Sequence, residues 1–75
     1  MACFEEEFGD NGEYKASLEI NPGETQGWVV GPDGYSASLA CLIDTGVLSN
    51  RTFEEHVVNR DIIDEIEEWA EENGY

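Results

Sequence analysis

The chain has 75 residues and a formal net charge of −15, because 18 Asp and Glu residues face only three Lys and Arg. So negative a charge argues against direct contact with nucleic-acid phosphates, which require Lys or Arg, and against binding to an anionic membrane surface. The hydrophobic content of 40% also argues against a disordered acidic tail. We therefore expect one small folded domain over residues 1–75, with basic proteins as its partners.

Two antiparallel strands are predicted at the N-terminus, over residues 3–8 and 13–20. The turn between them contains Asn11-Gly12, a pair that favours tight hairpins. The first strand places its Phe residues on one face and Glu5 and Glu7 on the other. The second strand alternates apolar and polar side chains, which indicates a half-buried strand; the apolar set is Tyr14, Ala16, Leu18 and Ile20.

A third strand is predicted around residues 26–30, after a turn at Asn21-Pro22-Gly23. We expect its Trp28 and Val30 to face inward. A further turn follows at residues 31–34. These elements form a three-stranded antiparallel meander with one solvent-exposed acidic face.

Residues 35–45 fit either a further hairpin arm or a short helix. Leu39, Leu42 and Ile43 have helical spacing, and Gly46 stands where a left-handed C-cap would. The pattern favours the helix.

The segment 52–58 leaves two alternatives open. Thr52 and Glu55 have the spacing of a helix capping box. The apolar residues of Phe53-Glu-Glu-His-Val-Val fit a fourth short strand equally well.

An amphipathic helix is predicted over residues 61–73, capped by Asn59 or Asp61 and ended by Gly74. At about 100° per residue, its apolar side chains fall within an arc of roughly 120°. Its acidic side chains fill a separate arc of roughly 160°; they are Asp61, Asp64, Glu65, Glu67, Glu68, Glu71 and Glu72. The expected fold class is α+β, with a three- or four-stranded antiparallel sheet packed against a short middle helix and this C-terminal helix.

The acidic face of the C-terminal helix is the strongest candidate for function. A charged stripe opposite an apolar one is usually only the solvated side of a helix, but such stripes normally interleave Glu with Lys. Here no cation interrupts the acids, and Glu71 and Glu72 lie at the negative end of the helix dipole. The seven acids of this helix are spaced at roughly one charge per 2.4 Å along its axis, which is of the same order as duplex DNA, with one charge per about 1.7 Å. The secondary charges expected to extend this surface are Glu5, Glu6, Glu7 and Glu13. Asp10, Glu19 and Glu24 could extend the field further along the sheet.

In size and one-sided acidity the chain resembles the small phage-encoded DNA-mimic inhibitors, which include anti-CRISPR, anti-restriction and glycosylase-inhibitor proteins. The resemblance is one of composition and charge pattern, most sharply over residues 61–72, and these families share no common fold. It implies a stoichiometric inhibitor that occupies the basic nucleic-acid-binding groove of a host protein. The most direct case is an anti-CRISPR protein that blocks target-DNA binding by a Cas effector complex in the host cytoplasm, as a monomer or homodimer.

A small acidic interaction or adaptor module, such as one adapted to concentrated salt, is the alternative. Salt adaptation would spread acids over every face and share them between Asp and Glu, whereas Glu outnumbers Asp 13 to 5. The location of the acids therefore distinguishes the two hypotheses.

Neither catalysis, a cofactor nor a metal site is expected. His56 follows Glu54-Glu55 in a chain so acidic that carboxylate neighbours arise by chance, and Gly9-Asp10-Asn11-Gly12 lacks the ligand spacing of a calcium loop. Cys3 and Cys41 have no metal-type or redox-type spacing, so two reduced thiols are expected.

The N-terminus lacks the basic and apolar segments of a secretory signal, and no apolar run approaches the roughly 20 residues that span a bilayer. Trp28 and Trp69 are predicted to anchor the core. An exposed Trp would instead be a candidate contact for a partner.

Overall fold

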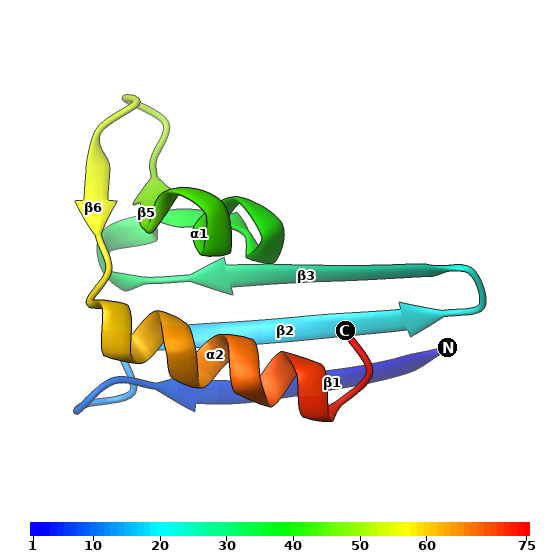
Figure 1. Ribbon diagram of the computed structural model, residues 1–75. Helices are drawn as coiled ribbons and strands as arrows, with labels where there is room; N and C mark the ends of the chain where they lie inside the picture. Colours follow the sequence, from blue (N-terminus) through cyan, green and yellow to red (C-terminus); the bar gives the residue numbers. More distant parts are fainter.

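Six antiparallel strands form a single sheet in the order β1-β2-β3-β4-β5-β6. The computed structural model describes residues 1–75, and Figure 1 shows the sheet with two helices on one of its faces. The strands are β1 (Ala2–Phe8), β2 (Tyr14–Asn21), β3 (Glu24–Val30), β4 (Ser36–Ser38), β5 (Val47–Ser49) and β6 (Glu55–Val57). The helices are α1 (Leu39–Thr45) and α2 (Arg60–Glu72), and the 3-10 turn η1 (Pro32–Gly34) joins β3 to β4.

The predicted α+β class is confirmed, although the sheet has more strands than expected. β4, β5 and β6 have three residues each. So short a strand shows no more than one alternation of apolar and polar residues, which is too little to mark it in a sequence.

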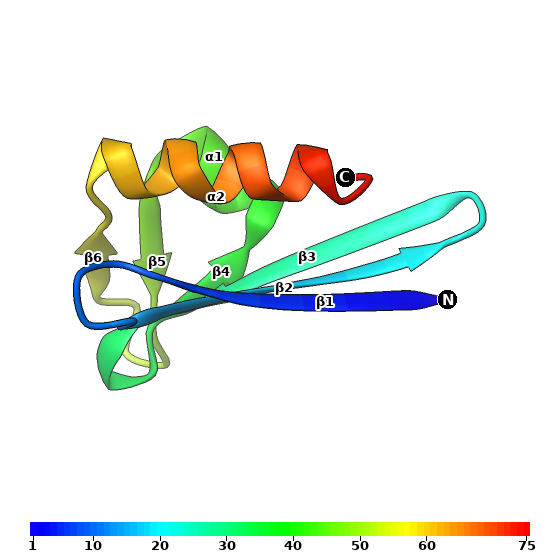
Figure 2. The same cartoon turned by 90° about the horizontal axis from the view of Figure 1, so that it is seen from below.

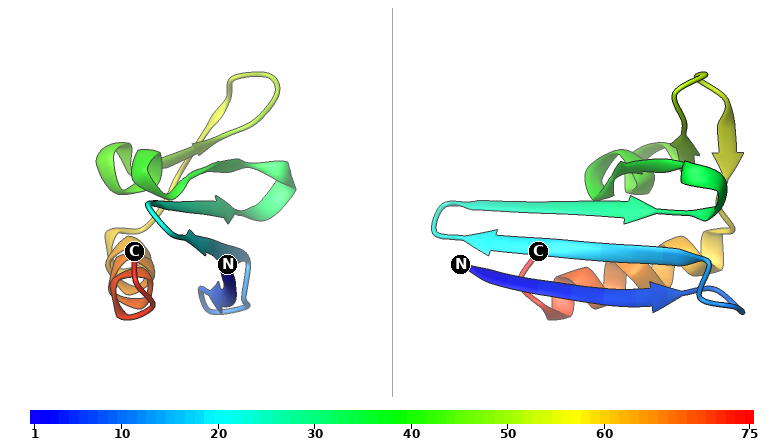
Figure 3. Two further views of the ribbon diagram at one scale, coloured as in Figure 1. Left: turned by 90° about the vertical axis from the view of Figure 1, so that its right-hand side faces the viewer. Right: turned by 180° about the vertical axis from the view of Figure 1, so that it is seen from behind.

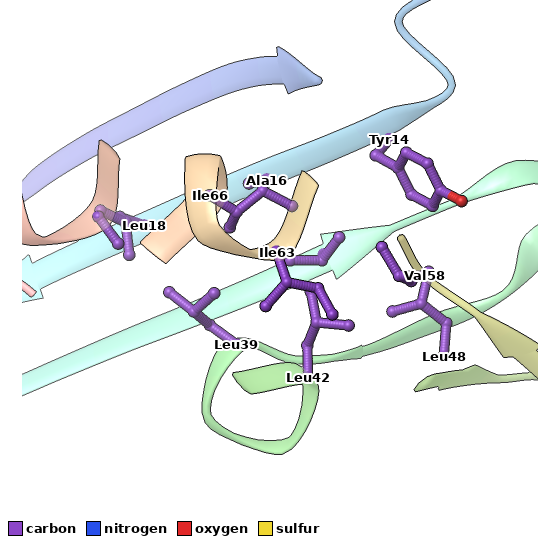
Figure 4. Packing of buried hydrophobic residues seen from close by; sticks show 11 residues of the cluster. Tyr14, Ala16, Leu18, Leu39, Leu42, Leu48, Val58, Ile63 and Ile66 are labelled. Atoms are coloured by element: carbon purple, nitrogen blue, oxygen red, sulfur yellow. The ribbon is translucent and has the colours of Figure 1, made fainter. Parts of the chain in front are cut away.

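The core lies between the sheet and the two helices, as Figure 2 shows from the edge. Eleven hydrophobic side chains are buried there, and no polar or charged residue is buried with them. Figure 4 shows this cluster, in which β2 and β3 face the apolar sides of α1 and α2. Its members are Tyr14, Ala16, Leu18, Val29, Leu39, Leu42, Leu48, Val58, Ile63, Ile66 and Ala70.

The prediction that Trp28 and Val30 face inward is wrong. The register of β2 and β3 places Val29 opposite the buried Ala16, and Trp28 opposite Ser17 on the other side of the sheet. Trp28 is 54% exposed and Val30 is 49% exposed. Because side chains of a strand alternate between faces, burying Val29 turns both of its neighbours outward.

Gly27 explains why this register is preferred. It lies opposite Leu18 on the helix side of the sheet. A Cβ atom at this position would come within 2.9 Å of the Leu39 side chain, so the absence of one lets α1 pack closely against β3. Gly27 therefore belongs to the buried side, although it carries no apolar side chain that the sequence pattern could reveal.

The predicted C-terminal helix is confirmed as α2. The Asn59 side chain caps its first turn by accepting a hydrogen bond of 2.8 Å from the Asp61 backbone N–H. At the edge of the core, the Trp69 ring meets the Phe8 ring of β1 edge-on, with ring centroids 5.7 Å apart. Trp69 thus anchors α2 to β1 as a partly buried residue.

The middle segment contains both structures that its sequence allowed. β4 comes first, and α1 then begins where the Ser38 hydroxyl accepts a hydrogen bond of 3.2 Å from the Cys41 backbone N–H. Gly46 ends α1 with a φ of 76°, which confirms the expected left-handed cap. Of the alternatives for residues 52–58, the strand is correct, because residues 55–57 form β6.

The loop between β5 and β6 holds Phe53 in an unusual conformation. Asn50 Oδ1 accepts hydrogen bonds from the Thr52 backbone N–H, the Thr52 hydroxyl and the Glu54 backbone N–H, at 3.0, 2.7 and 3.1 Å. The folded loop gives Phe53 a φ of 64° and leaves its side chain 89% exposed. A left-handed conformation costs a non-glycine residue about 1–2 kcal/mol.

Replacing Phe53 by Asn should therefore stabilise the protein. Asn tolerates the left-handed region far better, and the exposed ring contributes little burial, so we expect the free energy of unfolding to rise by about 0.5–1 kcal/mol. Urea unfolding measures the change. Phe53→Ala is the matched control, because it removes the ring but keeps the backbone strain; a loss of stability in Phe53→Asn would contradict the prediction.

Aromatic side chains fasten the β5–β6 hairpin to the rest of the sheet. The Tyr14 hydroxyl and His56 Nε2 share a hydrogen bond of 2.6 Å. The Tyr35 ring also packs against His56, with centroids 5.5 Å apart, and its hydroxyl donates to Glu54 Oε2 at 3.0 Å. These contacts give half-buried His56 a structural role.

The two tyrosines predict a loss of stability in alkali. Burial raises the pKa of Tyr14 above 10.0, and the Glu13 carboxylate raises it further. The hydrogen bond to Glu54 raises the pKa of Tyr35, with smaller effects from burial and nearby carboxylates. A tyrosine whose pKa is raised in the folded state contributes to the free energy of unfolding. This contribution is complete below about pH 10, the pKa in the unfolded chain, and is lost as the pH rises through the pKa of the folded state.

Urea unfolding at a series of pH values tests this expectation. The free energy of unfolding should fall above about pH 10, and Tyr14→Phe should make this fall shallower even if it lowers stability at neutral pH. An unchanged slope in both Tyr14→Phe and Tyr35→Phe would show that neither tyrosine causes it.

Candidate acidic interaction surface

The packing of α2 turns its predicted acidic face outward. Ile63, Ile66 and Ala70 are buried against the sheet, so the opposite side of the helix faces solvent. Six of the seven predicted carboxylates of α2 are exposed; they are Asp61, Asp64, Glu65, Glu68, Glu71 and Glu72. Glu67 is partly buried, because it lies one turn from both Ile63 and Ala70 on the flank of the apolar side.

The three predicted carboxylates of β1 are all exposed, but they point to different sides of the sheet. Glu6 pairs with Ala16 and lies on the helix side. Glu5 and Glu7 pair with Ser17 and Lys15 on the side without helices. β1 is an edge strand, and Figure 3 shows it beside α2 at the same end of the sheet. The acids therefore continue from α2 around the free edge of β1.

Glu13 is brought close to the first turn of α2. It lines a shallow hollow together with Asp10, Asp61 and Glu65, and no Lys or Arg lines that hollow. The Glu13 carboxylate also accepts a hydrogen bond of 2.9 Å from the Asn11 backbone N–H, which orders the turn after β1. Asp10 was expected to extend the acidic field along the sheet, and the packing of this turn places it beside the first turn of α2.

The acids are distributed unevenly over the molecule. α2 carries seven, β1 carries three and the turn after β1 carries two, which is twelve of the eighteen in the chain. We call these twelve side chains the acidic surface. The other six lie apart, on the β2–β3 hairpin, η1, α1 and the β5–β6 hairpin; they are Glu19, Glu24, Asp33, Asp44, Glu54 and Glu55.

Two of the three cations form exposed ion pairs with this surface. Lys15 Nζ is 3.5 Å from Glu5 Oε1, and Arg60 Nε is 3.1 Å from Asp64 Oδ1. Exposed pairs of this kind contribute about 0–1 kcal/mol each, so most of the repulsion among the carboxylates persists. Arg51 lies in the loop between β5 and β6, away from the acidic surface.

Other kinds of site find less support. No three His, Cys, Asp or Glu side chains are gathered so that they could hold a metal ion, and no helix is long and apolar enough to cross a membrane. Both cysteines are free and exposed. Comparison with protein-family models, curated proteins and solved structures found no match.

Exposed aromatic residues also lie outside the predicted site; they are Phe4, Trp28, Phe53 and Tyr75. Trp28 is on the open face of the sheet, and Phe53 is at the tip of the β5–β6 hairpin. Small residues surround Trp28: Gly27 precedes it in β3, and Ser17 and Ser38 lie opposite it in β2 and β4.

Repulsion within the acidic surface predicts that salt stabilises the fold. The screening length falls from about 10 Å at 0.1 M to about 3 Å at 1 M ionic strength, which removes most interactions between exposed charges. We expect the thermal midpoint to rise by about 4–8 °C, equivalent to about 1 kcal/mol for a domain of this size. Calorimetry in increasing NaCl measures this shift, and a midpoint that stays constant would contradict it.

Proposed function

We propose that this protein is a stoichiometric inhibitor that occupies the basic nucleic-acid-binding groove of a host protein in place of DNA. The most direct case is an anti-CRISPR protein of phage origin that blocks target-DNA binding by a Cas effector complex in the host cytoplasm. The observation that carries this proposal is the gathering of twelve of eighteen acids on α2, β1 and the turn after β1. Adaptation to concentrated salt gives no reason for such a concentration on α2 and the adjoining edge of the sheet.

The shape of the acidic surface supports the same proposal. With 13 residues, α2 is about 20 Å long, and the seven residues of β1 span about 23 Å. Both run lengthwise along a molecule whose longest dimension is 34 Å, as Figure 1 shows. The seven carboxylates of α2 form one row along this length, and Glu5, Glu6 and Glu7 add a shorter group of about 7 Å on β1. A groove lined with Lys and Arg could receive this row in place of a phosphate strand.

Binding through this surface requires neither a cofactor nor a catalytic step. The backbone that carries its carboxylates is already held in place, because α2 is anchored by the core and β1 by its seven-residue pairing with β2. A preformed backbone loses little conformational freedom on binding, which favours a one-to-one complex.

Charge reversal on α2 tests the proposal. We expect Glu65→Lys, Glu68→Lys and Glu72→Lys together to weaken binding to the target by at least about tenfold, since each reversed charge would repel a Lys or Arg of the groove. The helix should remain intact, because Lys is a good helix former and is favoured near a helix C-terminus. Circular dichroism verifies the fold.

The binding experiment uses the immobilised protein to capture targets from host lysate at moderate salt, followed by elution with duplex DNA. The eluted target is purified, and its DNA binding is titrated with the wild-type protein and the variants. The matched control is Glu24→Lys, Asp44→Lys and Glu55→Lys, which changes the net charge equally outside the acidic surface. Full inhibition by the α2 variant, or an equal loss in the control, would refute the proposal.

A further inference from the structure

Trp28 occupies the middle of the open face of the sheet, the face that neither helix covers. The strand registers place Glu5, Ser17, Trp28 and Ser38 side by side across β1, β2, β3 and β4. Trp28 is 54% exposed although it sits in the interior of a sheet. A large aromatic side chain exposed in this way is typical of a contact that a partner completes.

A hollow of about 460 Å³ lies beside the Trp28 side chain. Ser17 lines it from the neighbouring strand, and its small side chain leaves room between Trp28 and Glu5. Glu19, one position further along the same face of β2, also lines the hollow. The hollow therefore combines an aromatic side chain with two carboxylates.

Both carboxylates keep the capacity to bind a cation. Glu19 accepts a hydrogen bond of 3.1 Å from the Asn21 side chain through Oε1. Glu5 is paired only with Lys15, at 3.5 Å, and both side chains are more than half exposed. An exposed pair of this kind is weak enough for another cation to replace it.

We propose that this hollow receives an arginine side chain of the partner protein, with its guanidinium group stacked on Trp28 and paired with Glu5 or Glu19. Trp is the aromatic residue that attracts cations most strongly, and the planar guanidinium can stack on the indole while it donates two hydrogen bonds to a carboxylate. A net charge of −15 complements a basic partner. The proposal relies on the proposed function for the basic character of that partner, and it adds a defined anchor on a second face.

Lysine would fit the same hollow less well. Its ammonium group is a compact, strongly hydrated charge that neither stacks on the indole nor pairs with a carboxylate through two parallel hydrogen bonds. The carboxylates of the acidic surface can also pair with Arg through two hydrogen bonds, but they have no indole on which a guanidinium could stack. A preference for Arg over Lys that depends on Trp28 therefore distinguishes the hollow from general electrostatic attraction.

Titration calorimetry at low salt with hexa-arginine and hexa-lysine peptides tests this preference. We expect the wild-type protein to bind the arginine peptide about fivefold more tightly or better, as a cation–π contact of about 1 kcal/mol implies. Trp28→Ala should weaken binding of the arginine peptide about fivefold while changing that of the lysine peptide by less than about twofold. Trp28→Leu, which keeps apolar bulk without an indole, should behave in the same way and is available if Trp28→Ala folds poorly.

Val30→Ala is the matched control, because Val30 lies on the same face and is similarly exposed. It should keep the preference for arginine. The proposal is overturned if the wild-type protein shows no preference, or if both Trp28 variants retain it.

Failure of this proposal can be told apart from failure of the proposed function. The reversal of Glu65, Glu68 and Glu72 should weaken binding of both peptides and leave their ratio unchanged, since these residues lie on the helix side of the sheet. An unaltered ratio in the Trp28 variants refutes the arginine anchor alone. Unaltered inhibition by the α2 variant refutes the mimic alone.

Discussion

The whole structure depends on one apolar layer, held between a sheet and two helices that cover only one of its faces. A chain of 75 residues has material for a single core, and all eleven buried hydrophobic side chains lie in it. No charged group shares this layer, so its burial alone must outweigh the repulsion of a net charge of −15. Because α2 is fixed to the sheet by its apolar side, the direction of its carboxylates is fixed as well.

The free edge of β1 gives the acids a second role. An unpaired edge strand is a template for pairing with another chain, and natural proteins often place charges there to prevent it. Two β1 edges that met in antiparallel fashion would bring Glu5, Glu6 and Glu7 of one copy near those of the other. Under the proposed function, the same charges that oppose contact between copies would attract the basic partner.

The open face of the sheet connects the two proposed contacts. Glu5 belongs to the acidic surface and also lines the hollow beside Trp28. A partner that followed the acids around the edge of β1 would therefore reach the Trp28 hollow next. Carboxylates along α2 and at the edge of β1 provide long-range attraction, whereas a single aromatic residue provides a short-range contact that depends on the shape of the partner.

The long elements were determined by the sequence itself, because local patterns specify them. The spacing of Ile63, Ile66 and Ala70 predicted α2 and the direction of its acids, and Gly46 predicted the end of α1. What only the tertiary structure decided depends on contacts between distant segments. The side on which Trp28 emerges follows from the packing of Leu39 against Gly27, and β4 to β6 exist because neighbouring strands pair with them. Tertiary packing also brings the acids of β1 and of the turn after it next to those of α2. The contact between Phe8 and Trp69 joins these two distant segments of the chain.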